Sequence, residues 1–488
     1  MKKSRGNLIV SKWESVIGLE IHAQLSTKSK IFSASSTLYG KDPNKQASYV
    51  DLGMPGTLPV LNKSVIKKAI QFGLAINAKI ANKSIFARKN YFYPDLPKNY
   101  QISQLDSPIV EGGYIEIKDS NNQNKKINIT RAHLEEDAGK SIHSNENNCT
   151  YIDLNRAGTP LLEIVSEPEI ANSKEAVSYM KKIHNLVTYL DICDGNMQEG
   201  SFRCDANVSV RKIGDKNLGT RTELKNINSF KFVEKAINYE IQRQIDLLED
   251  GKNIIQETRL YDENKDSTKS MRSKEEANDY RYFPDPDLLP IEIEEKYIME
   301  IKNSLPELPE IKFEYYKSNY NFSEDQINII LSDIYITNFI DQAISLSKIE
   351  PKRVINYFVS LIYSKLNKEK LKLHKSELKV EIFCLLLELI ENKKITKNNF
   401  KNIIDSIWNK KNGVNEIIKS YTTDSEEDND SVDGLIHKVI SQNTKQVEEY
   451  KSGKTKIVGF FVGQVLKDAK GADPTSIKNK IIKILESV

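Results

Sequence analysis

The chain has 488 residues, of which 39% are hydrophobic and 28% charged, and its formal net charge is +3. At roughly 100–200 residues per domain, this length predicts two to four domains. No window approaches the roughly 18 consecutive apolar residues of a membrane span, so we predict a soluble protein. No apolar run follows the charged N-terminal residues, so we expect no signal peptide. The four cysteines form no C-x-x-C pair, which indicates a reducing compartment and argues against a cysteine-built zinc site. Any contact with nucleic acid must come from local basic patches.

Arginine, glycine and proline are distributed unevenly along the chain. Eleven of the 12 arginines lie before residue 285, and 15 of the 21 glycines lie before residue 252. Arginine is preferred where a planar fork must meet a carboxylate or phosphate, so we expect the demanding chemistry in this first part, although uneven drift towards lysine would give the same skew. Residues 310–412 contain no glycine and a single proline, Pro351, and this near-absence of breakers predicts packed helices.

Residues 13–25 predict a strand that carries polar, potentially functional side chains on one face. Alternate residues of a strand share a face, which groups Glu20, His22 and Gln24 opposite the intervening apolar residues. A carboxylate beside an imidazole can hold a divalent metal or relay a proton. A solvent-facing polar stripe is the alternative interpretation.

Residues 86–101 are rich in aromatic and cationic side chains. Rings and cations together are typical of a nucleic-acid surface, but they also line polar cavities. Pro94 and Pro97 predict an ordered loop here rather than a strand.

Four later segments also carry polar residues in strand-like or turn-like patterns: 133–140, 161–167, 200–210 and 222–226. In the third, Arg203, Asp205 and Asn207 alternate with core residues. Glu163 lies within an apolar run, where a carboxylate is costly to bury unless a metal or cation meets it. Each segment alone could be an exposed face. Together, oxygen ligands with one imidazole predict an Mg²⁺ site and hence phosphate chemistry.

The common nucleotide and hydrolase fingerprints are missing from the sequence. It contains no GxxxxGK[ST], no GxGxxG opening a helix, no GxSxG and no HExxH. If ATP binds, we therefore expect it on an antiparallel sheet.

In the C-terminal region, lysines at 451, 454, 456, 467 and 470 predict a basic face, and the spacing of Gly459 and Gly463 predicts a close approach of two helices.

Several long motifs are shared with a known family. They are Val16–His22, Arg88–Asp95, Glu135–Lys140, Asp153–Val165, Ser201–Asn207, Glu223–Asn226, Asp279–Pro284, and Gly459–Val465 with Lys470 and Gly471. On these motifs, which are spread over essentially the whole chain, the sequence resembles the B subunit of the aspartyl/glutamyl-tRNA(Asn/Gln) amidotransferases.

The resemblance implies an α+β fold in three parts. These are an antiparallel-sheet cradle domain with the kinase site at residues 1–293, an all-helical domain at 294–405, and a small helical, YqeY-like, tRNA-binding tail domain at 406–488. It also implies a heterotrimer in the cytoplasm, whose other members are an amidase (the A subunit) and a small protein (the C subunit).

The implied activity is that of a carbon–nitrogen ligase with glutamine as amido donor. The amidase frees ammonia, and the B subunit uses ATP and Mg²⁺ to phosphorylate the side-chain carboxylate of Glu-tRNA(Gln) or Asp-tRNA(Asn). Ammonia arriving through a channel then gives Gln-tRNA(Gln) or Asn-tRNA(Asn). Neither the tRNA used in the cell nor the residues that hold adenine can be told from the sequence.

Site residues follow from the matching motifs. The implied metal ligands are Glu20, His22, Glu135, Glu163, Asp205 and Glu223. Among these, Glu135 and Asp205 are expected to act in catalysis, with Arg203 as a phosphate contact. Lys89 and Lys98 resemble residues of the ammonia channel, and Lys467 and Lys470 are expected to contact tRNA.

The sequence departs from the family at one point. Many members hold a structural zinc with four cysteines, whose positions are occupied here by Ser33, Ser35, Ser48 and Asp51. Serine hydroxyls are poor zinc ligands, so we expect no zinc in this region.

Two other functions remain open from the sequence. A non-catalytic tRNA-binding adaptor would use the basic tail and would not need the acidic strand faces. A metal-dependent hydrolase acting on RNA would use clustered carboxylates, but it would not need glutamine or an amidase partner.

Overall fold

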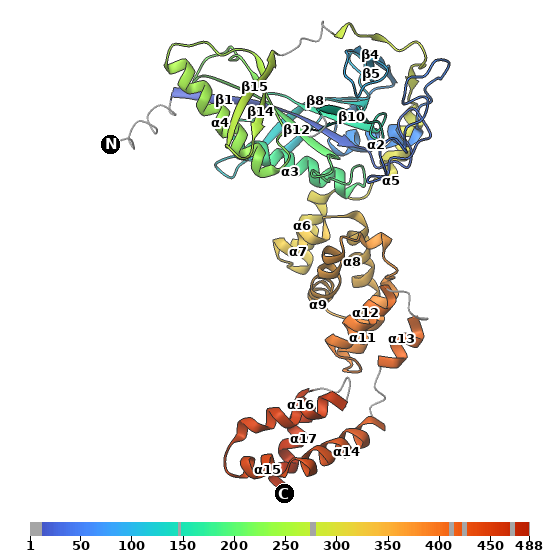
Figure 1. Ribbon diagram of the computed structural model, residues 1–488, viewed down its shortest axis with the longest axis vertical. Coiled ribbons are helices and arrows are strands. Elements are labelled where there is room, and N and C mark those ends of the chain that lie inside the picture. Colours follow the sequence, from blue (N-terminus) through green and yellow to red (C-terminus); the bar gives the residue numbers. More distant parts are fainter. Residues whose placement is uncertain are drawn as a thin grey trace. The chain divides into compact units, whose positions relative to one another are not determined.

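The computed structural model describes residues 12–144, 148–273, 280–408, 414–421, 427–468 and 474–487. The chain divides into two compact units, Met1–Ile311 and Lys312–Val488. The first contains a large sheet with helices, and the described part of the second is helical (Figure 1). The predicted α+β class, with a largely antiparallel sheet followed by helices, is confirmed. The predicted domain boundaries at 293 and 405 stay predictions.

A ten-stranded sheet forms the centre of the first unit, in the order β15-β14-β13-β12-β1-β11-β8-β6-β2, with β7 paired to β8. The strands are β1 (Trp13–Gln24), β2 (Lys79–Ile80), β6 (Val110–Glu111), β7 (Tyr114–Lys118), β8 (Asn124–Glu136), β11 (Pro160–Ser166), β12 (Phe202–Lys212), β13 (Thr222–Lys225), β14 (Glu257–Asp262) and β15 (Ser267–Ser273). β13 and β14 are parallel, and the other neighbouring pairs are antiparallel.

One face of the sheet is buried beneath helices. On β1, Leu19, Ile21 and Ala23 are at most 1% exposed, as the alternation of the sequence predicts. The helices α3 (Ser173–Tyr189) and α4 (Phe230–Glu249) pack on the strands β1, β7, β12 and β15 (Figure 1). Covering this apolar face leaves the opposite, polar face of β1 for the functional site.

The segment 86–101 forms a hairpin, so the prediction of a loop is wrong for its ends. β4 (Ala87–Asn90) pairs with β5 (Tyr100–Ser103), and β4 also pairs with β16 (Phe283–Pro284). The two prolines lie in the connection between the strands, where no ladder hydrogen bond is needed from them. Smaller elements of this unit are α2 (Lys63–Ala75), β3 (Lys83–Ser84), β9 (Lys140–Ser144), β10 (Cys149–Asp153), β17 (Ile291–Glu292) and α5 (Glu295–Ser304).

The predicted helices of residues 310–412 are confirmed over the part of that range that the structure describes. The helices are α6 (Pro309–Tyr320), α7 (Glu324–Ile330), α8 (Ile334–Leu346), α9 (Pro351–Tyr357), a π-helical segment (Phe358–Tyr363), α10 (Ser364–Glu369), α11 (Val380–Glu391) and α12 (Lys397–Trp408). Among the described residues no single helix has the length and apolar composition to cross a membrane; α7 and α8 meet that test only as a pair bent by 111°.

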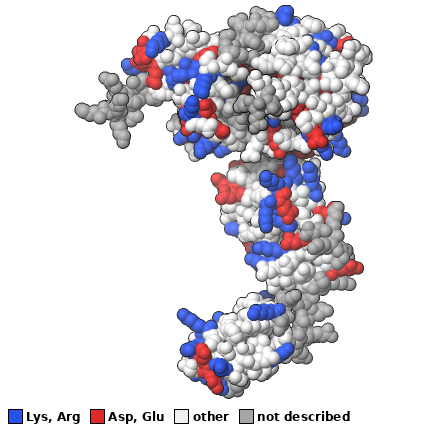
Figure 2. Space-filling model, viewed as in Figure 1, with Lys and Arg blue, Asp and Glu red and all other residues white. Residues whose placement is uncertain are grey.

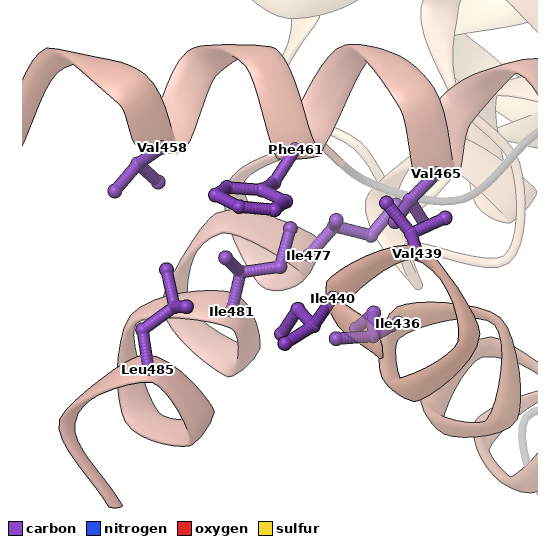
Figure 3. Packing of buried hydrophobic residues seen from close by; sticks show 9 residues of the cluster. All are labelled: Ile436, Val439, Ile440, Val458, Phe461, Val465, Ile477, Ile481 and Leu485. Carbon is purple, nitrogen blue, oxygen red and sulfur yellow. The ribbon is translucent and has the colours of Figure 1, made fainter. Parts of the chain in front are cut away.

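The remaining helices are α13 (Val414–Tyr421), α14 (Glu427–Gln442), α15 (Thr444–Lys451), α16 (Val458–Asp468) and α17 (Pro474–Ser487). A cluster of aliphatic residues around Phe461 joins α14, α16 and α17 (Figure 3). The predicted close approach at Gly459 and Gly463 is wrong, because both are exposed and no atom lies within 4 Å of a Cβ built on either. α16 packs instead through Val458, Phe461 and Val465, whose larger side chains bury more apolar area.

A buried ion pair holds the segment between β1 and α2. Lys30 Nζ lies 3.2 Å from Asp51 Oδ2, and neither side chain is more than 3% exposed. Ser33 Oγ donates to Asp51 Oδ1 over 2.9 Å, and Ser48 Oγ donates to Asp51 Oδ2 over 3.0 Å. Ser35 is the remaining one of the four residues that occupy the family's zinc-ligand positions, and it donates its backbone N–H to Ser33 Oγ. Hydroxyls and an ammonium group around one carboxylate do not fit zinc, whose protein ligands are thiolates, imidazoles and carboxylates.

We expect Lys30→Met to destabilise the first unit strongly. Removing one partner of a buried pair leaves the other charge buried without compensation, which costs about 3–5 kcal/mol. The measurement is the free energy of unfolding in urea. The double variant Lys30→Met/Asp51→Asn should lose less than the sum of the single variants, because both members of the pair are then neutral.

The matched control is Lys79→Met. Lys79 pairs with Glu111, but the two side chains are 75% and 42% exposed, so the loss should be at most about 1 kcal/mol. An equal loss from Lys30→Met and Lys79→Met would contradict the role of the buried pair.

Zinc at one equivalent per chain that requires Ser33 or Asp51 for its retention would contradict the prediction that no zinc is bound.

Candidate functional site

The register of three adjacent strands places the polar residues of β1 beside those of β11 and β12. His22 lies opposite Glu163 on β11 and opposite Arg203 on β12. Two residues along β1, Glu20 lies opposite Asp205. Because directly opposite residues of an antiparallel pair point to the same face, residues far apart in sequence form adjacent rows on the sheet.

A first group of possible metal ligands consists of His22, Glu135 and Glu163. Their ligand atoms all lie within 4.8 Å of one another. His22 Nε2 is 3.4 Å from Glu163 Oε2 and 3.7 Å from Glu135 Oε1. A second histidine, His133, contacts Glu163 Oε2 through Nε2 at 3.3 Å, and its Nδ1 accepts a hydrogen bond from Arg131 Nε.

A second group consists of Glu20, Asp205 and Glu223, again with ligand atoms within 4.8 Å of one another. Lys225 makes salt bridges to Asp205 and Glu223, the latter at 3.3 Å between Nζ and Oε1. Asn207 Nδ2 donates to Glu20 Oε1 over 2.7 Å, and Thr258 Oγ1 donates to Glu223 Oε2 over 2.8 Å. These hydrogen bonds orient the carboxylates.

The crowded carboxylates shift the pKa values of their neighbours. Burial alone would lower the pKa of His22, but Glu163, Glu135 and Asp205 raise it to about 9. Burial and the charge of Glu163 raise the pKa of Glu135. Burial disfavours the charged form of Glu163 too, but the two histidines hold its pKa well below the ordinary value. The site therefore accumulates negative charge that a cation can compensate.

Both groups adjoin one cavity of about 440 Å³. Its lining includes His22, four of the carboxylates of the two groups, and the cationic side chains of Lys89, Arg131, Arg221 and Lys225. Tyr91, Tyr280 and Tyr282 contribute rings, and Lys89 Nζ lies 4.8 Å from the centroid of the Tyr280 ring. Hard oxygen donors with one imidazole suit Mg²⁺, and neighbouring cations suit the phosphate groups of a nucleotide.

The other predicted site residues lie in different surroundings. Arg203 Nη1 is 2.9 Å from Asp137 Oδ2, so the structure pairs it with a carboxylate, and its contact with phosphate stays a prediction. Lys98 lies in the connection between β4 and β5 and makes a salt bridge with Glu136 at the end of β8. Lys467 is exposed near the end of α16. Lys470 lies outside the described residues.

Sequence reasoning missed four basic residues of the site: His133, Lys225, Arg131 and Arg221. The first two could have been found by alternation, because they lie two residues from Glu135 and Glu223 on the same strands. Arg221 precedes β13, and no periodic pattern marks it.

Comparisons with known proteins agree with this geometry. Residues 15–299 match the GatB/GatE catalytic domain, and residues 338–485 match the family described as GatB domain. Proteins named as the B subunit of aspartyl/glutamyl-tRNA(Asn/Gln) amidotransferase are similar over nearly their whole length. That of Alkalilimnicola ehrlichii is 52% identical over 477 residues, covering 98% of this chain and 100% of the relative. Those of Halorhodospira halophila and Pseudomonas syringae are 51% and 50% identical, each covering 97% of this chain and 99% of the relative.

The first unit thus carries the catalytic domain of a tRNA amidotransferase. The chain belongs to the family of the aspartyl/glutamyl-tRNA(Asn/Gln) amidotransferase B subunits.

We expect the contribution of His22 to stability to fall as pH rises in metal-free protein. Its pKa is about 9 in the folded chain and about 6.5 when unfolded, so the protonated form stabilises the fold fully below pH 6.5. This contribution, up to about 3 kcal/mol, is lost as pH rises through 9. Urea unfolding of the unsubstituted protein and of His22→Gln, both in chelator, should give a difference that shrinks between these pH values.

The control is His143→Gln, because His143 is exposed on β9 and forms a hydrogen bond with Thr150 rather than with a carboxylate. The difference in unfolding free energy between the unsubstituted protein and His143→Gln should not shrink in this way. A difference between the unsubstituted protein and His22→Gln that stays constant from about pH 6 to about pH 9.5 would show that His22 is not held protonated by its neighbours.

Proposed function

We propose that this chain is the carboxylate-activating member of a glutamine-dependent tRNA amidotransferase. It uses ATP to phosphorylate the side-chain carboxylate of Glu-tRNA(Gln), Asp-tRNA(Asn) or both. Ammonia then attacks the carbonyl carbon of the acyl phosphate and displaces inorganic phosphate. The product is the side-chain amide. The observation that carries this proposal is the pair of three-residue ligand groups on adjacent rows of one sheet, beside a cavity with four cationic side chains. A tRNA-binding adaptor has no need of such a site.

Two Mg²⁺ ions would fit the donors, one at His22, Glu135 and Glu163, where the ion would displace the proton of His22, and one at Glu20, Asp205 and Glu223. When bound, Mg²⁺ neutralises charge on phosphate oxygens. The chain itself contributes position and charge, which are the main requirements of phosphoryl transfer. Arg131, Arg221 and Lys225 line the cavity and provide donors for phosphate or carboxylate oxygens, which offset the repulsion between the substrates and the acidic wall.

The hairpin of β4 and β5 is our candidate for the arrival point of ammonia. Lys89 lines the cavity beside the rings of Tyr91 and Tyr280. Lys98 lies farther along the hairpin and makes a salt bridge with Glu136. A polar path along this hairpin would pass ammonia while limiting its exchange with bulk water. The supplier would be an amidase, the A subunit, which together with this chain and a small C subunit would form a heterotrimer in the cytoplasm.

The tail helices are our candidate for contact with the tRNA backbone. Lys456 and Lys478 line another cavity, of about 420 Å³, near the N-terminal ends of α16 and α17, and Lys467 is exposed on α16. Figure 2 shows Lys and Arg side chains interspersed with acidic ones over the visible face of this helical unit. Helix N-termini and lysines together favour phosphate groups.

Asp205→Asn tests the activation step. Loss of charge stabilisation in the transition state should lower ATP-dependent amide formation by about 10²–10³-fold. The assay follows formation of Gln-tRNA or Asn-tRNA by the assembled enzyme, and hydrolysis of glutamine by the amidase partner should persist. Asp215→Asn is the control, because Asp215 is an exposed carboxylate just beyond β12. Normal amide formation by Asp205→Asn would overturn the proposed site.

Lys456→Gln and Lys478→Gln test the tail. Lysine contacts with phosphate release counterions, so each lost contact should reduce the slope of log K against log salt concentration by about one. The measurement is binding of aminoacyl-tRNA to the assembled enzyme across a salt series. Lys368→Gln, which removes an exposed lysine on α10, is the control. Unchanged slopes for both tail variants would remove these lysines from the tRNA contact.

A further inference from the structure

A buried carboxylate lies behind β13, the strand that carries Glu223. This carboxylate belongs to Glu240 on α4, the helix that connects the parallel strands β13 and β14 (Figure 1). α4 packs on the face of the sheet opposite the cavity, and the Glu240 side chain is 0% exposed. A charged carboxylate in such surroundings is costly unless neighbouring groups compensate it. No step of the proposed reaction uses Glu240.

Glu240 is bound by three consecutive strands of the sheet. On β13, Thr222 Oγ1 donates to Glu240 Oε1 over 2.8 Å. On β14, Arg259 Nε lies 3.4 Å from Glu240 Oε2. On β15, Thr268 Oγ1 donates to Glu240 Oε2 over 3.2 Å. One carboxylate thereby fixes the positions of β13, β14 and β15 relative to α4.

The helix contributes two further partners of the same carboxylate. Arg243 donates to both oxygens of Glu240, over 2.6 Å from Nη2 to Oε1 and over 3.0 Å from Nε to Oε2. Gln244 Nε2 lies 3.0 Å from Glu240 Oε1 and 3.0 Å from the carbonyl oxygen of Val208 on β12. Both carboxylate oxygens are therefore hydrogen-bonded, and two arginines compensate the charge.

The strand residues that Glu240 holds are next to residues that line the cavity. On β13, Thr222 directly precedes Glu223, and on β14 Arg259 directly follows Thr258. Successive side chains of a strand point to opposite faces, so each anchor on the helix side has a neighbour on the cavity side. Thr258 Oγ1 donates to Glu223 Oε2 over 2.8 Å across the parallel pair. A displacement of either strand would disturb this contact.

β13 is a short strand in a position that needs an anchor. It has four residues, of which three pair with β12 and three with β14. The ligand atoms of Glu223, Glu20 and Asp205 lie within 4.8 Å of one another. Like charges at this separation repel, and the repulsion acts to move β13 away from its neighbours. The contacts of Glu240 on the opposite face oppose that movement.

We propose that Glu240 is a positioning residue for the metal site. Through Thr222 it holds Glu223 at the distance from Glu20 and Asp205 that a divalent cation requires. This assignment rests on the proposed role of these three carboxylates as ligands of Mg²⁺. Groups that orient metal ligands from behind typically change metal affinity or activity by about 10–100-fold when they are replaced.

Thr222→Val and Thr222→Ser test the link between Glu240 and β13. Valine has nearly the shape of threonine but no hydroxyl, whereas serine keeps the donor to Glu240. Mn²⁺ is the probe, because carboxylate ligands suit it and its free ion is measured by electron paramagnetic resonance. In the assembled amidotransferase, Thr222→Val should weaken one class of bound Mn²⁺ by about tenfold, and Thr222→Ser should leave Mn²⁺ binding unchanged.

Glu240→Gln tests the carboxylate itself. The amide replaces one accepting oxygen with a nitrogen and removes the charge that the two arginines compensate. It should therefore weaken the same class of Mn²⁺ by about tenfold. In both Glu240→Gln and Thr222→Val, the Mg²⁺ concentration for half-maximal amide formation should rise by the same factor, while the KM for aminoacyl-tRNA stays unchanged.

Two further variants separate positioning from stability and from ligation. Ile183→Ala removes a fully buried side chain of α3 that is not a partner of Glu240, so it should lower the melting temperature and leave Mn²⁺ binding unchanged. Glu223→Gln removes the proposed ligand and should weaken the same class of Mn²⁺ as Thr222→Val does.

Three results would overturn the assignment, and they separate its failure from that of the proposed function. Unchanged Mn²⁺ binding in Thr222→Val and Glu240→Gln, with weakened binding in Glu223→Gln, would leave the metal site standing without this positioning. Equal weakening by Ile183→Ala or by Thr222→Ser would assign the effect to lost stability or lost packing. Unchanged Mn²⁺ binding in Glu223→Gln would reject the second ligand group and the positioning built on it.

Discussion

The antiparallel pairing of β1 with β11 on one side and β12 on the other is the constraint on which the site depends. A strand alternates its side chains between two faces, so a shift of one residue would turn Glu20 and His22 into the core and Leu19 and Ile21 into the cavity. The apolar residues of β1 are buried beneath the helices, which opposes that shift. Burial on one face of the sheet thereby determines which charged groups meet on the other.

That register concentrates carboxylates that repel one another. The structure offsets the repulsion with partners at the same positions: the protonated His22 and the imidazole of His133 beside Glu163, and the ammonium group of Lys225 beside Asp205 and Glu223. The raised pKa of His22 and the lowered pKa of Glu163 are two consequences of one arrangement. Side chains of the chain itself thus compensate part of the negative charge, and the proposed Mg²⁺ ions would compensate the rest.

The same balance of charge and burial organises the segment that leads away from β1. Lys30 and Asp51 are both buried, and the hydroxyls of Ser33 and Ser48 complete the hydrogen bonding of the carboxylate. An ion pair of this kind is costly to break although its net contribution is small, because each partner alone would be a buried charge. Hydrogen bonds and charge pairing thus hold together a segment in which the sequence offers no thiolate for a metal.

The sequence by itself determined which residues share a strand face, because a period of two depends only on the local backbone. The polar faces of β1, β11 and β12 and the helical composition of residues 310–412 could be predicted for that reason. Only the tertiary structure decided that the six expected ligands form two groups of three, and that Arg203 turns to Asp137. It also decided the packing of Phe461 in place of the glycines on α16. These outcomes depend on distances between strands and helices far apart along the chain, which residue spacing within one segment does not specify.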